Sequence, residues 1–157
     1  MIAVPVVPPA LGATITDKLA QLTERPPLPA TAAGEALQAS LEYVWACSAF
    51  CADACLRDAG LLEWLATEGR LLEDCSRDIY VQAVGVATEP GAHDDAVFMS
   101  ALRRFCRRHL VRIAWRDLAG IASVDTVLQE LSWLADACID AACRHATAVL
   151  GKRHGVP

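Results

Sequence analysis

Four arginines recur at four-residue spacing in the segment LRRFCRRHLVRIAWRDLAG, which covers residues 102–120: Arg104, Arg108, Arg112 and Arg116. The segment carries six arginines and no lysine, and its only acid is Asp117. Side chains four residues apart share one face of a helix, and like charges at this spacing repel by roughly 0.2–0.5 kcal/mol per pair. We therefore expect an anionic group to face this arginine row.

Three anionic partners are conceivable for the arginine row. The first is the acidic first half of the chain, because residues 35–78 hold nine acids against three arginines. The second is nucleic acid, which the formal net charge of −5 and the lack of interleaved lysines or an aromatic stacking platform disfavour. The third is an acidic or phosphate-bearing surface of another domain. Charge balance within the chain favours the first partner.

Asp117 falls inside the apolar arc of the same predicted helix, near its C-terminal end, where the helix dipole disfavours an anion. The arc comprises Phe98, Leu102, Phe105, Cys106, Leu110, Ile113, Ala114 and Leu118. We expect Asp117 to be a buried acid paired with Arg144 or His145 of the last helix. Such a pair is more often structural than catalytic.

The chain has seven cysteines, and none of them forms a CxxC pair. Cys47, Cys51 and Cys55 recur every four residues, which raises the alternative of a metal site completed by His109 or His145. Structural zinc sites usually combine short-spaced cysteine pairs with a distant second pair or with histidines. We therefore predict no metal ligand and expect small buried apolar residues of a reducing compartment.

No recognisable catalytic motif is present. The sequence lacks the patterns of a phosphate-binding loop, a dinucleotide fingerprint, a nucleophile elbow and a zinc-protease helix. The acids Asp53, Asp58, Asp94 and Asp95 lie at expected helix starts or surfaces, where capping explains them. We predict no catalytic and no cofactor-binding residue.

The composition predicts an all-α fold, an irregular bundle of about five to six helices around one core. The 157 residues are 54% hydrophobic but only 6% aromatic, and few windows are rich in β-branched residues. Residues 1–33 contain six of the eight prolines and predict a Pro-rich, loosely ordered lead-in. We find no signal-peptide pattern and no membrane-spanning run, and we expect a soluble cytoplasmic protein.

Cap and stop residues predict the helix boundaries. Thr31 or Gly34 opens the first helix, and Ser48 caps a second one that Gly60 ends. Asp58 is expected to cap a third helix that stops at Gly69.

Residues 70–87 show a weaker helical pattern, followed by a loop at Pro90 and Gly91. Asp94 or Asp95 caps a long helix reaching Leu118, and Ser123 caps the last helix. The last helix is expected to bury one face: Val127, Leu131, Leu134, Ala135, Cys138, Ala142 and Val149.

Three stretches together resemble a known family. The arginine-rich segment, followed by LQELSWLADACIDAA, is similar to the helical region that precedes the nucleotidyltransferase core of bifunctional glutamine synthetase adenylyltransferase/adenylyl-removing enzymes. Upstream, VWACSAFCADACLRDAGLLEWL resembles that family's N-terminal helices. The resemblance runs from about Leu37 to Ala146.

The resemblance implies a two-headed enzyme that attaches AMP to glutamine synthetase from ATP and removes it by phosphorolysis, with Mg²⁺ as cofactor. It places this chain in the adenylyl-removing half, with glutamine synthetase and the PII signal protein as partners. Residues 34–150 would form the helical domain and residues 151–157 a linker to a missing nucleotidyltransferase core, so we expect a truncated, inactive piece. The alternative is a free-standing helical interaction module that binds an acidic protein partner.

Overall fold

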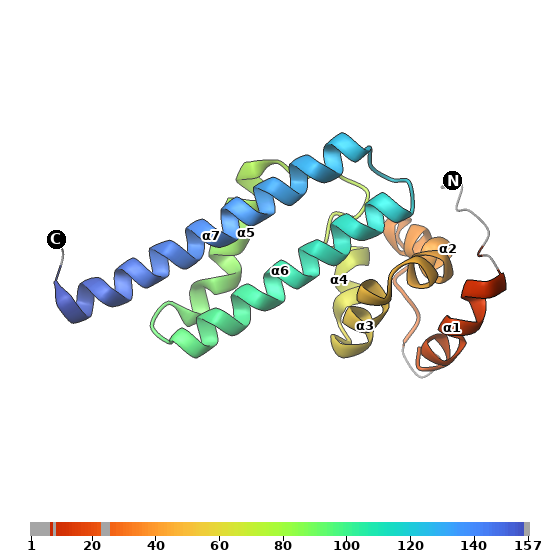
Figure 1. Ribbon diagram of the computed structural model, residues 1–157, viewed down its shortest axis with the longest axis horizontal. Coiled ribbons are helices and arrows are strands. Elements are labelled where there is room, and N and C mark those ends of the chain that lie inside the picture. The colour runs from red at the N-terminus through yellow and green to blue at the C-terminus, as the bar shows by residue number, and fades with distance from the viewer. Residues whose placement is uncertain (1–6, 8, 23–25, 156–157) are drawn as a thin grey trace. The chain divides into compact units, whose positions relative to one another are not determined.

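The computed structural model describes residues 7, 9–22 and 26–155, and all regular elements in these residues are helices (Figure 1). They are α1 (Pro9–Ala20), α2 (Ala32–Cys47), α3 (Ala49–Arg57), α4 (Leu61–Thr67), α5 (Arg77–Thr88), the short 3-10 helix η1 (Glu89–Gly91), α6 (Asp95–Leu118) and α7 (Val124–His154). The predicted all-α fold is confirmed. No helix in this part of the chain has the length and apolar character needed to cross a membrane.

The chain divides into two compact units rather than the single core that the composition predicted. Unit 1 contains residues 1–74 and 108–127, and unit 2 contains residues 75–107 and 128–157. Two of the three boundaries, 107/108 and 127/128, fall inside long helices, so α6 and α7 each contribute to both units. At 1.5 Å per residue, the 24-residue α6 and the 31-residue α7 are about 36 and 46 Å long, which exceeds one small core.

The core of unit 1 forms around α2, which contacts α1, α3 and α4 (Figure 1). Leu37 and Trp45 of α2 are fully buried there, together with Trp115 of α6. The Trp115 indole N–H donates a hydrogen bond to Ser40 Oγ at 2.8 Å. A buried indole thereby gains the polar partner that it requires.

The predicted caps of α2 and α3 are confirmed. Thr31 Oγ1 accepts a hydrogen bond from the Gly34 amide at 3.0 Å, and Ser48 Oγ accepts one from the Cys51 amide at 3.2 Å. Both hydroxyls satisfy amide groups that have no partner within the first turn of a helix.

Part of the predicted lead-in is helical. It contains α1, whose Ile15 is 5% exposed and belongs to the core of unit 1. Lys18 Nζ lies 2.7 Å from Asp53 Oδ1 of α3. A proline can begin α1 because the first amide of a helix needs no partner. The parts of the lead-in prediction that fall on residues 1–6, 8 and 23–25 lie outside the described residues.

The connection around α4 differs from the prediction. Asp58 ends α3 rather than capping α4, whose N-cap is Gly60. The weak helical pattern of residues 70–87 is helical only from Arg77, where Ser76 Oγ accepts a hydrogen bond from the Ile79 amide at 3.4 Å. Residues 68–76 are irregular, and their backbone groups need partners outside a helix.

The ends of α6 follow the predicted signals. Asp94 Oδ1 accepts hydrogen bonds from the amides of Ala96 and Val97 at 2.9 and 3.1 Å. Gly91 precedes this cap and lies so close to Phe98 that an added Cβ atom would fall 2.3 Å from the Phe98 amide nitrogen. Gly120 follows α6 with a φ of 66°, a conformation that favours glycine.

Helix α7 begins as predicted, but its buried face includes only Val127 and Leu134 of the predicted one. Ser123 Oγ accepts a hydrogen bond from the Thr126 amide at 3.1 Å. The buried residues are Val127, Glu130, Leu134, Ala137 and Ala141. Of the predicted face, Ala135 is exposed and Leu131, Cys138, Ala142 and Val149 are only partly buried. Apolar residues lie on two sides of α7, and the predicted face fell between them. Only one of these sides is buried.

Candidate functional site

The structure divides the arginine row between the two units. Arg104 lies in unit 2 and is exposed, whereas Arg108, Arg112 and Arg116 lie in unit 1. The Arg108 side chain is 17% exposed, whereas Arg112 and Arg116 are only 0% and 2% exposed. The inward-facing side of α6 in unit 1 therefore includes Arg112 and Arg116 as well as apolar residues.

The guanidinium group of Arg112 binds backbone carbonyl groups of the irregular segment after α4. Its Nε and Nη2 atoms donate to the carbonyl oxygen of Arg70 at 3.2 and 3.0 Å, and Nη2 also donates to the carbonyl oxygen of Glu73. Arg70 has a φ of 50°, a left-handed conformation that costs a non-glycine residue roughly 1–3 kcal/mol. Arg112 thus stabilises a sharp turn whose carbonyl groups no helix satisfies.

Arg116 binds the same segment one helical turn later. Its Nη1 atom donates to the carbonyl oxygen of Leu71 at 3.0 Å and to that of Glu73, and its Nη2 atom pairs with the carboxylate of Asp74. We call Arg70–Asp74 the 70–74 segment. Arg112 and Arg116 together bind this segment, which belongs to the acidic half that charge balance favoured as the partner.

Arg108 forms a bidentate ion pair with Asp58. Its Nε donates to Asp58 Oδ2 at 2.8 Å and its Nη2 donates to Oδ1 at 3.0 Å. The guanidinium carbon also lies 5.5 Å from the centre of the Trp64 ring. Parallel hydrogen bonds and cation–π contact both favour arginine over lysine at this position.

His109 lies between these arginines along α6 and is buried. Its ring meets the Trp64 ring edge to face, with the centroids 5.1 Å apart. Burial, followed by the positive charges of Arg112 and Arg108, lowers the pKa of His109 to about 3. The imidazole is therefore neutral at neutral pH and adds no charge to the row.

Asp117 is exposed, which corrects the prediction that it is a buried acid. In this half of α6 the buried side is centred on Arg112, with Val111, Trp115 and Ala119, so Asp117 points to the opposite side. Its expected partners make other contacts within unit 2. Arg144 pairs with Asp140, and His145 Nε2 lies 2.8 Å from Asp95 Oδ1 while its ring stacks on Phe98 at 3.8 Å.

The sequence analysis missed a buried acid in unit 2. Glu130 of α7 is 1% exposed, and its two carboxylate oxygens accept hydrogen bonds from the Cys75 amide and the Tyr80 hydroxyl, both at 2.9 Å. These contacts position the start of α5. The available signal was an acid between Val127 and Leu134, at the spacing of a core-facing stripe.

The cysteines differ in their surroundings. Cys51, Cys55 and Cys75 are buried, whereas Cys47 and Cys143 are exposed. Among the described residues, no group of three or more His, Cys, Asp or Glu side chains is arranged to hold a metal ion.

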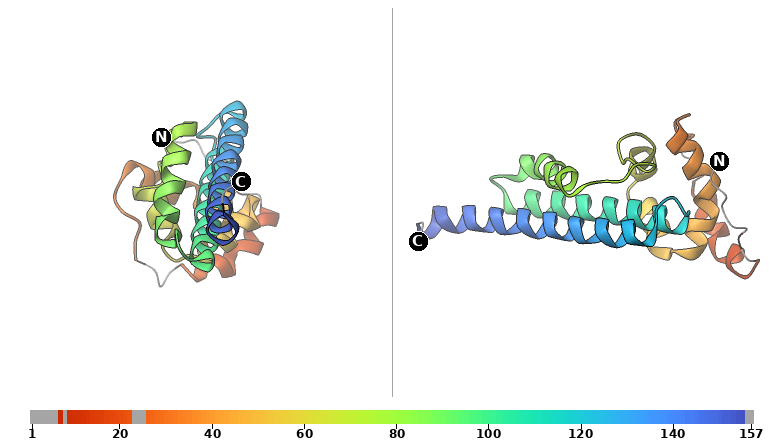
Figure 2. Two further views of the ribbon diagram at one scale, coloured as in Figure 1. Left: turned by 90° about the vertical axis from the view of Figure 1, so that its left-hand side faces the viewer. Right: turned by 90° about the horizontal axis from the view of Figure 1, so that it is seen from above.

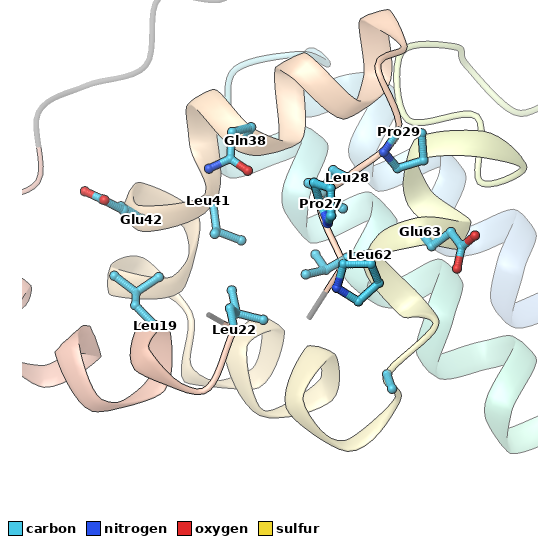
Figure 3. Close-up of a pocket in the computed structure, with 12 residues that line it drawn as sticks. Leu19, Leu22, Pro27, Leu28, Pro29, Gln38, Leu41, Glu42, Leu62 and Glu63 are labelled. Atoms are coloured by element: carbon cyan, nitrogen blue, oxygen red, sulfur yellow. The ribbon is translucent and has the colours of Figure 1, made fainter. Parts of the chain in front are cut away.

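Unit 1 also contains an apolar pocket of about 440 Å³ (Figure 3). Leu19, Leu22, Leu41 and Leu62 converge on it, and Pro27, Leu28 and Pro29 cover one side. Glu42 and Glu63 lie at its edge, and the described lining residues include no arginine or lysine. Such a lining does not suit a nucleotide phosphate, which requires positive charge or a cluster of amide groups.

The family model and the similar proteins all indicate the same protein family. The family model described as Glutamate-ammonia ligase adenylyltransferase matches residues 38–157. Similar proteins include bifunctional glutamine synthetase adenylyltransferase/adenylyl-removing enzymes of Nitrosococcus oceani (40% identity over 74% of this chain), Thioalkalivibrio sulfidiphilus (37% over 75%) and Pseudomonas aeruginosa (38% over 64%). The matches cover only 12%, 12% and 10% of those proteins. No solved structure shows significant similarity to the chain.

Proposed function

The chain belongs to the glutamate-ammonia ligase adenylyltransferase family, and from this premise we propose that it forms a helical, non-catalytic part of an enzyme that adds AMP to glutamine synthetase and removes it. The observation that carries the proposal is the family match over residues 38–157, which spans both compact units. The chain corresponds to about one-eighth of the length of the relatives that it matches, so the activity of the whole enzyme requires residues that this chain does not supply.

We assign no step of nucleotide chemistry to this chain. In this family we expect ATP and Mg²⁺ to bind a nucleotidyltransferase core, where paired carboxylates hold the metal beside the phosphates. The described residues do not fit that role, because they offer no metal-holding group and because Arg108, Arg112 and Arg116 bind acceptors within unit 1. We further propose that this chain belongs to the adenylyl-removing half, acts in the cytoplasm and meets glutamine synthetase and the PII signal protein only as part of the whole enzyme.

A free-standing module that binds an acidic partner through the arginine row is less well supported. Arg108, Arg112 and Arg116 already bind acceptors in unit 1, so an outside partner would have to replace those contacts. We propose Arg104 as an interface residue because it is exposed on α6.

Two experiments test the proposed function. The purified chain, incubated with adenylylated glutamine synthetase, phosphate and Mg²⁺, should release no ADP, and release above background would contradict a non-catalytic role. In the second experiment, this chain replaces the matching segment of the Nitrosococcus oceani enzyme. The chimera should retain adenylyl removal, and the same chimera with Arg112→Met should lose it together with thermal stability. A stable but inactive chimera would count against the assignment.

A further inference from the structure

Helix α7 carries a second apolar stripe on the side opposite its buried face. It comprises Leu128, Ser132, Ala135, Ile139, Cys143, Ala146 and Leu150, all exposed, and we call it the outer row. Leu128, Ile139 and Leu150 are 58%, 63% and 54% exposed. Helix α7 is one continuous helix (Figure 2). At 100° per residue, the seven positions of the outer row fall within a stripe roughly 80° wide along it. All seven positions lie in unit 2.

The spacing of the outer row is the same in both directions along the helix. From Ile139 the next positions lie 4, 7 and 11 residues away on either side, so Leu128 mirrors Leu150 and Ala135 mirrors Cys143. A second copy of the helix, running antiparallel, would therefore place Ile139 against its own copy and Leu128 against Leu150. This is the self-complementary arrangement that a two-fold dimer requires.

The side chains of the outer row suit close packing of two helices. Ala135, Cys143 and Ala146 are small and let the backbones approach, while the three large residues fill the ends and the centre. The hydroxyl group of Ser132 donates to the carbonyl oxygen of Leu128 at 3.0 Å, so it can be covered without losing its partner.

The charges of α7 are divided in the way that antiparallel pairing needs. Residues 124–140 contain three exposed acids and no arginine or lysine, whereas residues 141–154 contain two arginines, one lysine and no acid. Asp125 and Arg153 are both exposed and lie 14 residues from Ile139 in opposite directions, so an antiparallel copy brings Asp125 near Arg153 of the second chain. A parallel copy would bring like charges together.

We propose that the outer row is a self-association surface, on which α7 of one chain packs antiparallel against α7 of a second copy. From Leu128 to Leu150 the contact would be about 33 Å long and about one helix diameter, or 10 Å, wide. The area covered by a contact of this length and width is small compared with the ~1,200–2,000 Å² that a stable interface buries. We therefore expect a weak dimer that forms in the micromolar to millimolar concentration range. The inference does not depend on the proposed function.

Sedimentation equilibrium of the whole chain over that concentration range tests the pairing. The wild-type chain should shift from monomer to dimer. Ile139→Lys should weaken the dimer roughly tenfold or more, because it places two positive charges against each other at the two-fold axis. Val86→Lys is the matched control: Val86 is 72% exposed in the same unit but lies on α5, and its variant should dimerise like the wild type.

A charge exchange tests the antiparallel direction. Asp125→Arg alone should weaken the dimer, because it places two positive charges near each other. Adding Arg153→Asp should restore the dimer, because position 125 of each chain then again faces an opposite charge at position 153 of the other chain. Circular dichroism confirms that each variant keeps its helices. A chain that stays monomeric at every concentration, a dimer that survives Ile139→Lys, or a failure of the double variant to recover would each overturn the proposal.

Discussion

The guanidinium group of Arg112 donates two hydrogen bonds to the carbonyl oxygen of Arg70, a residue with a left-handed backbone. This contact explains why α6 carries a row of like charges. The cost of repulsion between Arg108, Arg112 and Arg116 is offset because each group binds acceptors of unit 1. The row stabilises the connection between α4 and α5 instead of presenting three free cations to a partner.

The Arg108–Asp58 ion pair should contribute measurably to stability. Both side chains are less than one-fifth exposed, and the geometry is bidentate. In a double-mutant cycle with Arg108→Gln and Asp58→Asn, we expect a coupling free energy of about 1 kcal/mol that falls in high salt. Urea unfolding at low and high salt measures it.

The matched control for this cycle is the pair Arg144 and Asp140, which lies on the surface of α7 with both side chains more than half exposed. Its coupling should stay within roughly 0.5 kcal/mol. Equal coupling in the two cycles would show that burial does not strengthen the Arg108 pair.

Glu130 should stabilise unit 2 through its two partners. Tyr80→Phe removes the donor to one carboxylate oxygen of a buried acid, and we expect a loss of about 1–2 kcal/mol in the free energy of unfolding. Glu130→Gln should also be destabilising, whereas Asp136→Asn, at an exposed acid of the same helix, should change the stability by less than about 0.5 kcal/mol. If Glu130→Gln and Asp136→Asn had the same small effect on the free energy of unfolding, the hydrogen bonds of Glu130 would not contribute to stability.

His109 should make the chain less stable as the pH falls below neutrality. Its pKa is about 3 in the folded chain and 6.5 in the unfolded reference, so between these values the unfolded chain binds the extra proton. A folded-state pKa below the unfolded one therefore lowers stability as the pH drops, by about 2 kcal/mol between pH 7 and pH 5.

The measurement is the difference in unfolding free energy between the wild-type chain and His109→Asn at several pH values. The wild-type chain should lose about 2 kcal/mol more than the variant between pH 7 and pH 5, because the carboxylates contribute equally to both. Parallel curves would mean that His109 accepts a proton in the folded chain.

The sequence predicted the helices better than the surroundings of their polar residues. Thr31, Ser48, Asp94 and Ser123 were identifiable as caps because capping depends on a few neighbouring residues. The start of α5 at Arg77 was not, because the irregular segment before it depends on donors more than 35 residues away in sequence.

The same limit applies to the candidate site. The sequence analysis placed Asp117 on the buried side, because it drew the inward-facing arc of α6 through the apolar residues alone and left out Arg112 and Arg116. In unit 1 the backbone carbonyl groups of the 70–74 segment take the place of water, so the arginine side of α6 faces inward. Those acceptors are backbone atoms, and no residue type in the sequence marks them.

The unfolding free energy of Arg112→Met, compared with that of Arg103→Met, tests the central claim most directly. Arg103 is exposed on the same helix, and its replacement should change the stability by less than about 0.5 kcal/mol. Arg112→Met removes both Arg112 donors from the carbonyl oxygen of Arg70 and a further donor from that of Glu73, so we expect a loss of about 2–4 kcal/mol. An Arg112→Met chain as stable as the Arg103→Met chain would contradict the account that the arginine row stabilises the interior of unit 1.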